Sequence, residues 1–140
     1  MNKSLWLVWG VVLLFFCGCH VCEEARVGPV EERCSGELSA GFCSNDASKF
    51  INCLTAETRK QFGPEEFKAS REQICRRMGE PVKKKYVGKL RHPFLDIDLW
   101  QITFERQGKG ENKKIYQDAL FQVVSLREGE KERVISFGFL

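Results

Sequence analysis

The sequence predicts an α+β fold in which N-terminal helices pack on an antiparallel sheet. Three observations support this prediction. Apolar residues recur with the helical period of 3.6 up to about residue 78, and with the strand period of two after residue 81. Short turn-forming segments separate the later apolar stretches, which favours hairpins and an antiparallel meander. Because the helices precede the strands without alternating with them, α+β is favoured over α/β.

The first 18 residues are typical of a secretory signal segment. Lys3 supplies a positive charge, an apolar stretch runs from Leu5 to Phe16, and the small residue Gly18 follows. This stretch is shorter than the roughly 20 apolar residues that a membrane-spanning helix needs. We therefore expect residues 1–18 to be removed on export, with a retained anchor as the alternative.

The end of this segment resembles the bacterial lipobox, in which a cysteine that follows a small residue is lipidated. Gly18 and Cys19 fit that pattern, whereas Phe16 and Cys17 depart from it. The resemblance implies a lipid on Cys19 that holds the protein in the membrane of a bacterial cell envelope. His20 at the next position implies an outer-membrane address where the cell has an outer membrane. An ordinary signal peptide with an unmodified Cys19 is the alternative.

Residues 19–43 carry glycines and mixed charges without a clear apolar period, so we interpret them as a lipid-anchored tether. The folded domain is then expected to cover residues 44–140. Its first helix is predicted to begin near Ser44–Asp46, whose side chains can accept free backbone N–H groups. An apolar stripe from Ala47 to Leu54 follows, and the helix is expected to continue for about one more turn.

A second helix is predicted over Pro64–Met78. Proline stands at the first helical position, acidic residues occupy the first turn, and Gly79 follows the last turn. Beyond it, alternating apolar residues predict strands of an antiparallel sheet. The expected strands cover residues 85–90, 100–105, 115–126 and 134–139. Ile135, Phe137 and Phe139 are expected to share one face of the last strand, with Ile135 and Phe137 turned toward the core.

Composition narrows the possible functions. The net charge of +3 is small and evenly spread, so it does not indicate a nucleic-acid partner. An apolar fraction of 43% and a charged fraction of 29% are typical of a globular domain. We find no nucleotide-binding loop, and a single Cys-x-x-Cys spacing lacks the second pair of a structural zinc site. We therefore expect no metal and no cofactor.

The sequence contains seven cysteines, which in an exported domain predicts disulfides. Five remain once the signal segment is removed and the lipid-bearing cysteine is acylated, so at least one stays unpaired. We expect a bridge between Cys53 and Cys75, because each flanks the apolar stripe of a predicted helix. Cys34 and Cys43 would form the companion bridge, leaving Cys22. Reduced cysteines in the core are the alternative.

The order of elements resembles that of small exported bacterial domains of unknown function in the cystatin-like, nuclear-transport-factor-2-like superfamily. Residues 63–80 and 84–86 are similar to the second helix and the following strand of these domains, and residues 116–139 to their closing strands. The resemblance covers roughly residues 44–140. It implies a curved, cone-shaped sheet with helices against its concave face, and no agreed activity.

Enzymes of the wider superfamily carry out acid–base chemistry with groups inside the cone, where an apolar pocket shifts the pKa. The candidate pocket residues here are Asp98, Tyr116 and Asp118, with His92 and Asp96 also considered. Asp98 shares the register of the apolar residues in the strand that follows it. The alternative is that all of these groups lie in solvent at the rim, and we assign no catalytic residue.

The favoured function is therefore that of a non-catalytic envelope lipoprotein. Its membrane contact would be the lipid on Cys19, and its domain would bind an envelope protein, a peptide or an apolar ligand. The alternative is a hydrolase or isomerase that uses the cone interior. An apolar pocket with a buried carboxylate would favour the enzyme, whereas a cone filled by aromatic side chains would exclude it.

Overall fold

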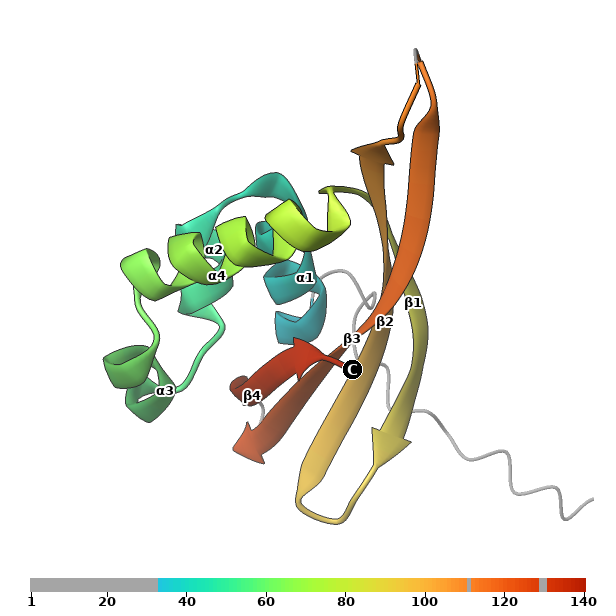
Figure 1. Cartoon of the computed structure of the whole chain (residues 1–140). Helices are drawn as coiled ribbons and strands as arrows, with labels where there is room; N and C mark the ends of the chain where they lie inside the picture. Colours follow the sequence, from blue (N-terminus) through green and yellow to red (C-terminus); the bar gives the residue numbers. More distant parts are fainter. Residues whose placement is uncertain (1–32, 111, 129–130) are drawn as a thin grey trace, which may run out of the picture.

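The computed structural model describes residues 33–110, 112–128 and 131–140 (Figure 1). The predicted signal segment, Cys19 and Cys22 lie outside these residues. Helices come first along the chain and strands follow. The helices are α1 (Cys34–Ser44), α2 (Ala47–Asn52), α3 (Ala56–Gln61) and α4 (Pro64–Met78), and the strands are β1 (Glu80–Arg91), β2 (Leu95–Gln107), β3 (Lys114–Glu128) and β4 (Lys131–Phe139).

The strands form one open sheet with the order β1-β2-β3-β4, in which every neighbouring pair is antiparallel. The helices lie together on one face of this sheet (Figure 1). The α+β class and the antiparallel meander predicted from the sequence are thus confirmed. Each predicted strand lies within an observed strand, and the observed strands are longer because the hairpin arms continue their pairing toward the turns.

Local signals placed two helix boundaries correctly. The Asp46 side chain accepts the Lys49 N–H at 2.9 Å, which caps α2. Helix α4 covers the predicted range, and Gly79 ends it with a φ of +98°. A side chain at that φ would be strained, and an added Cβ would lie 2.1 Å from the Glu105 carbonyl oxygen, so only glycine fits there.

The first predicted helix is interrupted, because β4 binds the backbone that follows α2. The Val134 N–H donates to the Cys53 carbonyl at 3.0 Å, and the Thr55 N–H donates to the Val134 carbonyl at 2.9 Å. These bonds replace helical ones, and the chain restarts as α3 with Thr55 as its cap. A long-range contact therefore overrides the local apolar period.

Residues 34–43, which were expected to belong to the tether, are part of α1 instead. This helix is largely buried, and its small residues let it lie deep against its neighbours. At Gly41 an added Cβ would stand 2.8 Å from the Phe50 backbone nitrogen, so α2 approaches α1 through a glycine. Small residues inside a buried helix leave no apolar stripe, which is why the period did not reveal α1. The folded domain thus includes α1 and begins before residue 44.

The core lies between the helices and the sheet. Along β2, alternate side chains are buried from Asp96 to Phe104. In the β3–β4 pair, Ser125 pairs with Val134 and its neighbour Val124 pairs with Ser136, so Ile135 is an extra, unpaired residue in the register of β4. Val134 is therefore buried, and Ile135 is not part of the core. The expectation that Ile135 faces the core was therefore wrong, because a bulge moves the strand's apolar face by one residue. The buried apolar residues are Leu38, Phe42, Phe50, Cys53, Leu54, Phe67, Trp100, Ile102, Phe104, Phe121, Val123 and Val134.

Within the described ranges, the structure contains no helix that combines the length and apolar character needed to cross a membrane.

Candidate ligand-binding groove

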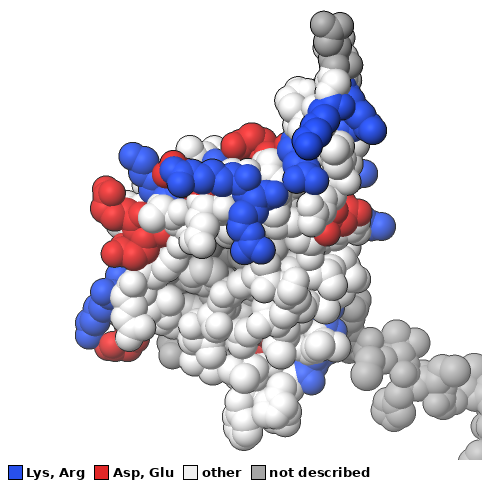
Figure 2. Space-filling view, in the orientation of Figure 1, with Lys and Arg blue, Asp and Glu red and all other residues white. Residues whose placement is uncertain are grey.

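A cavity of about 240 Å³ lies between α4 and the β3–β4 part of the sheet. It belongs to an uncharged face below α4, whereas charged side chains gather along α4 above it (Figure 2). Helices, strands and the segment between α3 and α4 all contribute to its wall, which is largely aromatic. The lining residues are Phe42, Phe50, Phe62, Phe67, Ser70, Arg71, Ile74, Phe121, Phe137, Gly138 and Phe139.

The aromatic rings hold one another in place around this cavity. The Phe50 ring meets the Phe137 ring edge-on at 4.9 Å between centroids, and it lies 4.9 Å from the Phe67 ring. Phe62 meets Phe137 in a second edge-on contact at 4.9 Å. Such contacts have preferred geometries, so the rings fix one another's orientation. The cavity that they enclose is suited to an apolar group.

Arg71 is the charged residue in the wall, and its charge is already paired. Its Nε donates to the Phe42 carbonyl at 2.9 Å, and its Nη2 donates to Glu80 Oε2 at 3.0 Å. The guanidinium also lies 5.8 Å from the centre of the Phe42 ring. These contacts tie α4 to α1 and β1, so Arg71 supports the wall.

A second hollow of about 440 Å³ adjoins the first and shares Ile74 and Phe139 with it. We call the two hollows together the α4 groove. The second hollow is more polar, because Arg77 and Asp118 border it. Its remaining lining residues are Met78, Gln117, Ala119, Leu120 and Leu140.

The α4 groove opens beside an edge of the sheet. Strand β4 ends where Phe139 pairs with Phe121, so within the described residues β3 has no strand neighbour on that side over 114–120. The Leu140 N–H donates to the Leu120 carbonyl at 2.9 Å, which shows that the backbone of Leu120 points toward this edge. Backbone groups alternate sides along an antiparallel strand, so those of Tyr116 and Asp118 also point there. This segment can pair with an added strand.

The predicted pocket residues do not come together. Asp98 lies on the core face of β2 and is completely buried, whereas Tyr116 lies on the opposite face and is 59% exposed. Asp118 lies on that opposite face as well, where it accepts hydrogen bonds at 2.6 Å from Gln101 and Thr103. Asp118 borders the second hollow of the α4 groove and is absent from the lining of the first. The interior site suggested for these three residues is therefore not formed.

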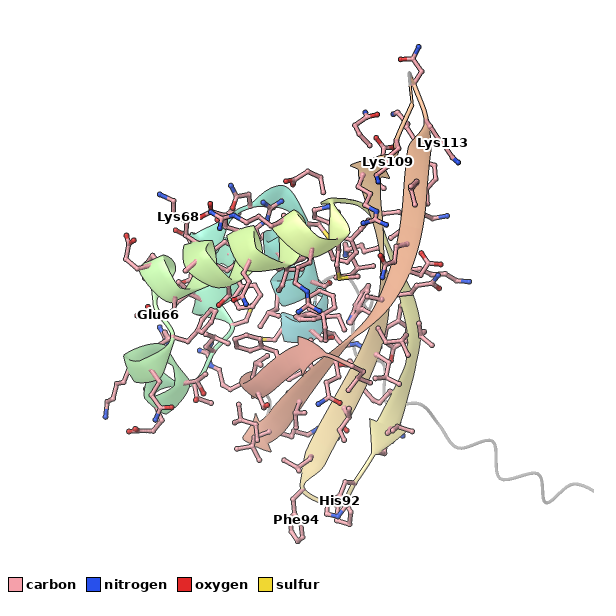
Figure 3. All side chains as sticks on the ribbon, in the orientation of Figure 1. Glu66, Lys68, His92, Phe94, Lys109 and Lys113 are labelled. Atoms are coloured by element: carbon pink, nitrogen blue, oxygen red, sulfur yellow. The ribbon has the colours of Figure 1, made fainter. Side chains whose placement is uncertain are left out.

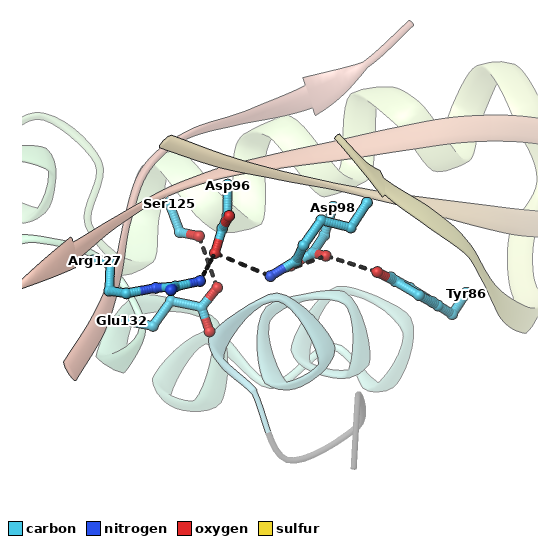
Figure 4. A network of polar contacts seen from close by, with 7 residues as sticks. Tyr86, Asp96, Asp98, Ser125, Arg127 and Glu132 are labelled. Carbon is cyan, nitrogen blue, oxygen red and sulfur yellow. Dashed lines mark hydrogen bonds and ion pairs between the residues drawn. The ribbon is translucent and has the colours of Figure 1, made fainter. Parts of the chain in front are cut away.

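Asp98 belongs to a polar cluster that joins β1, β2 and β3 (Figure 4). Tyr86 donates its hydroxyl hydrogen to Asp98 Oδ1 at 3.0 Å, and the Lys89 ammonium lies 3.8 Å from the same oxygen. Lys89 also donates to Asp96 at 3.1 Å, and Arg127 donates to Asp96 at 2.7 Å. Two carboxylates and two cations thus neutralise each other.

The electrostatics of this cluster favour ion pairs. Burial acts to raise the pKa of Asp96, but hydrogen bonds from Arg127 and Lys89 outweigh burial and lower it. Burial, together with the hydrogen bond to Asp98, raises the pKa of Tyr86 to about 12. A carboxylate stabilised in its charged form is a weak base at neutral pH. Neither Asp96 nor Asp98 lines the cavity below α4.

His92 lies in the exposed turn between β1 and β2, where its N–H donates to the Leu95 carbonyl at 2.9 Å. Figure 3 shows His92 and Phe94 at the tip of this turn, away from the helices. His92 is thus distant from the groove. The described part of the chain holds no group of three or more side chains arranged to bind a metal ion.

The expected disulfide pairs do not fit the fold, and the four described cysteines carry free thiols. Cys34 and Cys43 lie nine residues apart on α1, a rise of about 14 Å. Cys75 lies beside Glu80 at the start of β1, whereas Cys53 bonds to Val134 on β4. Across the sheet, Glu80 aligns with Tyr116 of β3, whereas Val134 pairs with Ser125 of β3. The two positions are therefore nine residues apart along β3, or about 30 Å of extended strand. A disulfide needs Cα atoms roughly 4.4–6.8 Å apart, so both expected bridges are excluded.

The α4 groove itself was not predicted. Most Phe side chains of the described residues lie in the core or pack against it. Which rings leave space between them depends on the angle at which α4 crosses the sheet and on where β4 ends. A partial signal was present in Phe62, Phe67 and Ser70, because a small polar residue interrupts an apolar helix face there.

Neither the protein-family models nor the curated proteins give a match to this sequence. Among solved structures, the chain is similar to RPA3114, a SEC-C motif containing protein from Rhodopseudomonas palustris. The TM-score is 0.52 and the identity 11%, over 73% of this chain and 72% of that chain. Bd1075 from Bdellovibrio bacteriovorus aligns with a TM-score of 0.45 and 8% identity, over 75% of this chain and 37% of that chain. The likeness to RPA3114 shows a shared fold.

Proposed function

We propose that this protein is a non-catalytic binding module, exported and held at a bacterial cell envelope by a lipid on Cys19. Its α4 groove binds an extended peptide segment of a partner protein and receives one bulky apolar side chain. The observation that carries this proposal is the cavity of about 240 Å³ walled by phenylalanine rings. The lipid anchor rests on Gly18 and Cys19 at the end of the apolar stretch.

We also assign the fold to the cystatin-like, nuclear-transport-factor-2-like class, with a curved sheet around the helices. The order of helices and strands and the placement of the helices on one sheet face support this assignment. The assignment concerns the fold, since one fold serves many functions.

The size of the cavity limits the ligand. An engineered cavity of about 150 Å³ binds benzene, whereas pockets for drug-sized ligands measure about 300–1,000 Å³. A cavity of about 240 Å³ therefore fits one aromatic ring or one branched aliphatic side chain. A whole lipid or cofactor would exceed it.

The open edge of β3 favours a peptide over a free small molecule. A peptide that pairs with residues 114–120 would satisfy the backbone groups of Tyr116 and Asp118. Its side chains would alternate between the two faces of the sheet, so every second one would lie under α4. The more polar second hollow, bordered by Arg77, would hold the neighbouring polar part of the peptide.

The proposal does not assign acid–base catalysis, because the buried carboxylates lie elsewhere. Asp96 is paired with Lys89 and Arg127, and Asp98 with Tyr86 and Lys89. A general base must be able to reach the proton that it removes. No carboxylate lines the 240 Å³ cavity that would receive the apolar group.

The test is a nuclear magnetic resonance titration of the isotope-labelled protein with short peptides. One peptide carries a central phenylalanine flanked by threonines, and the control peptide carries a central lysine. We expect amide shifts from the phenylalanine peptide in α4 and along residues 114–120, and none from the lysine peptide. Shifts in α4 without shifts along residues 114–120 would mean that the phenylalanine side chain binds without strand pairing, which would contradict the proposed binding of an extended peptide.

A matched pair of variants tests the cavity itself. Ser70→Leu fills the cavity, whereas Ala69→Leu adds the same side chain at an exposed position of the same helix. We expect Ser70→Leu to weaken binding of the phenylalanine peptide by at least about tenfold, and Ala69→Leu to leave it unchanged. Equal affinities for the two variants would refute the binding site.

A further inference from the structure

Two cysteines meet at the end of the helical layer that contacts β4. Cys34 is the first residue of α1, and its thiol donates to the Glu132 carbonyl at 3.0 Å. Cys53 follows α2, and its carbonyl accepts the Val134 N–H at 3.0 Å. Glu132 and Val134 are two residues apart on a strand, a separation of about 7 Å. The same short segment of β4 therefore holds both cysteines.

The positions of the described cysteines exclude other disulfide partners for Cys34 and Cys53. The spacing of Cys34 and Cys43 along α1, and the placement of Cys53 and Cys75 at separate ends of the sheet, exclude those two pairs. Cys75 instead lies at the end of α4, with its thiol 3.8 Å from Glu80. Cys43 lies about 14 Å further along α1 than Cys34, near Arg71 and Cys75. Among the described cysteines, Cys34 is thus the partner that lies beside Cys53.

We propose that Cys34 and Cys53 form a redox-active dithiol that a disulfide oxidant, either a small molecule or a protein, converts to an intramolecular disulfide. The bond joins the start of α1 to the end of α2 beside β4. It is independent of the proposed peptide binding, because neither cysteine lines the α4 groove.

The two thiols have different roles in this exchange. A hydrogen bond from Cys53 is the main cause that lowers the pKa of Cys34, and Arg133 acts in the same direction. The hydrogen bond to Cys34, followed by burial, raises the pKa of Cys53. A thiolate is the attacking form, so Cys34 attacks first and Cys53 resolves.

With oxidised glutathione as the oxidant, the steps balance. The Cys34 thiolate attacks one sulfur of the glutathione disulfide, forms a mixed disulfide and releases one glutathione thiolate. The Cys53 thiol loses its proton and attacks the Cys34 sulfur, which releases the second glutathione. The protein loses two electrons and two protons, and one glutathione disulfide becomes two glutathione thiols.

The experiment treats the reduced, full-length protein with oxidised glutathione at neutral pH, then blocks the remaining thiols and maps tryptic peptides. Trypsin leaves Cys34 and Cys43 in one peptide, residues 34–49, so mapping is done on Cys43→Ser as well as on the wild type. We expect a species that joins residues 34–49 to residues 50–59 in both proteins. We also expect oxidation to raise the melting temperature by about 15 °C, since the bridge closes a loop of about 20 residues.

Single variants distinguish the roles. Cys53→Ser should accumulate one glutathione on Cys34, whereas Cys34→Ser should leave Cys53 unmodified, because Cys53 is only 7% exposed. Neither variant should gain thermal stability on oxidation, and Cys75→Ser should behave as the wild type. A bridge between Cys53 and Cys75, loss of the bridge in Cys43→Ser, or unmodified Cys34 and Cys53 thiols in the wild type would each overturn the proposal.

Discussion

At Gly41, helix propensity and tertiary packing predict opposite effects of an alanine substitution on stability. Replacing a glycine inside a helix by alanine stabilises a helix by about 1 kcal/mol when nothing else changes. In α1, however, the added Cβ of Gly41→Ala would lie 2.8 Å from the Phe50 nitrogen and 3.0 Å from the Asp46 carbonyl oxygen. Both contacts are with backbone atoms, so α1 and α2 must move apart.

The magnitude follows from these opposing effects. Overpacking a core costs about 1–3 kcal/mol, and a contact with rigid backbone belongs at the upper end of that range. After subtracting about 1 kcal/mol of helix propensity, Gly41→Ala should destabilise the domain by about 2 kcal/mol. For a domain of about 100 residues, this lowers the melting temperature by about 10 °C.

Thermal and urea unfolding, followed by circular dichroism, measure this change. The control is Gly138→Ala, because an added Cβ at Gly138 has no neighbour within 4 Å. That variant should be neutral or more stable by up to about 1 kcal/mol, since alanine restricts the unfolded chain. If Gly41→Ala proved as stable as the wild type, the close packing of α1 on α2 would be refuted.

Two further predictions concern the polar cluster and the N-terminus. Because the folded-state pKa of Asp96 is lowered, its ion pairs with Lys89 and Arg127 stabilise the domain fully above about pH 4 and are lost at lower pH. In urea unfolding, the difference in stability between the wild type and Asp96→Asn should therefore be clear at pH 7 and narrow below about pH 4. A difference that does not change with pH would contradict this prediction. Expressed in a bacterial host with a labelled fatty acid, Cys19→Ser should lose the label and membrane attachment whereas Cys22→Ser keeps both, and labelling of Cys19→Ser would rule out the anchor.

The order and type of most elements followed from short-range information. Proline and acidic residues at the start of α4, together with Gly79 at its end, act within a few bonds of the backbone that they control. Alternation along β2 survives because one face of the strand is buried for its whole length. Such signals depend on neighbours in the sequence, so sequence alone was sufficient to predict α4, the strands and the antiparallel sheet.

Contacts between segments that are distant in the sequence determined the remaining features of the fold. Helix α1 exists because the small side chains at Gly41 and its neighbours let it enter the core, and Val134 divides the predicted first helix into α2 and α3. A bulge turned Ile135 out of the core. Each of these depends on an atom more than eight residues away, which no local period encodes.

The candidate site shows the same division. The sequence supplied the phenylalanines and the cysteines as residue types, but the groove arises only where α4 crosses the sheet over β3 and the C-terminal end of β4. The proposed pairing of Cys34 with Cys53 likewise depends on β4, which contacts both cysteines and lies about 80 or more positions later in the chain. Composition and local pattern thus determined which residue types the site contains. Tertiary packing determined which of them come into contact, because cavities and covalent partners depend on distances that only the folded chain defines.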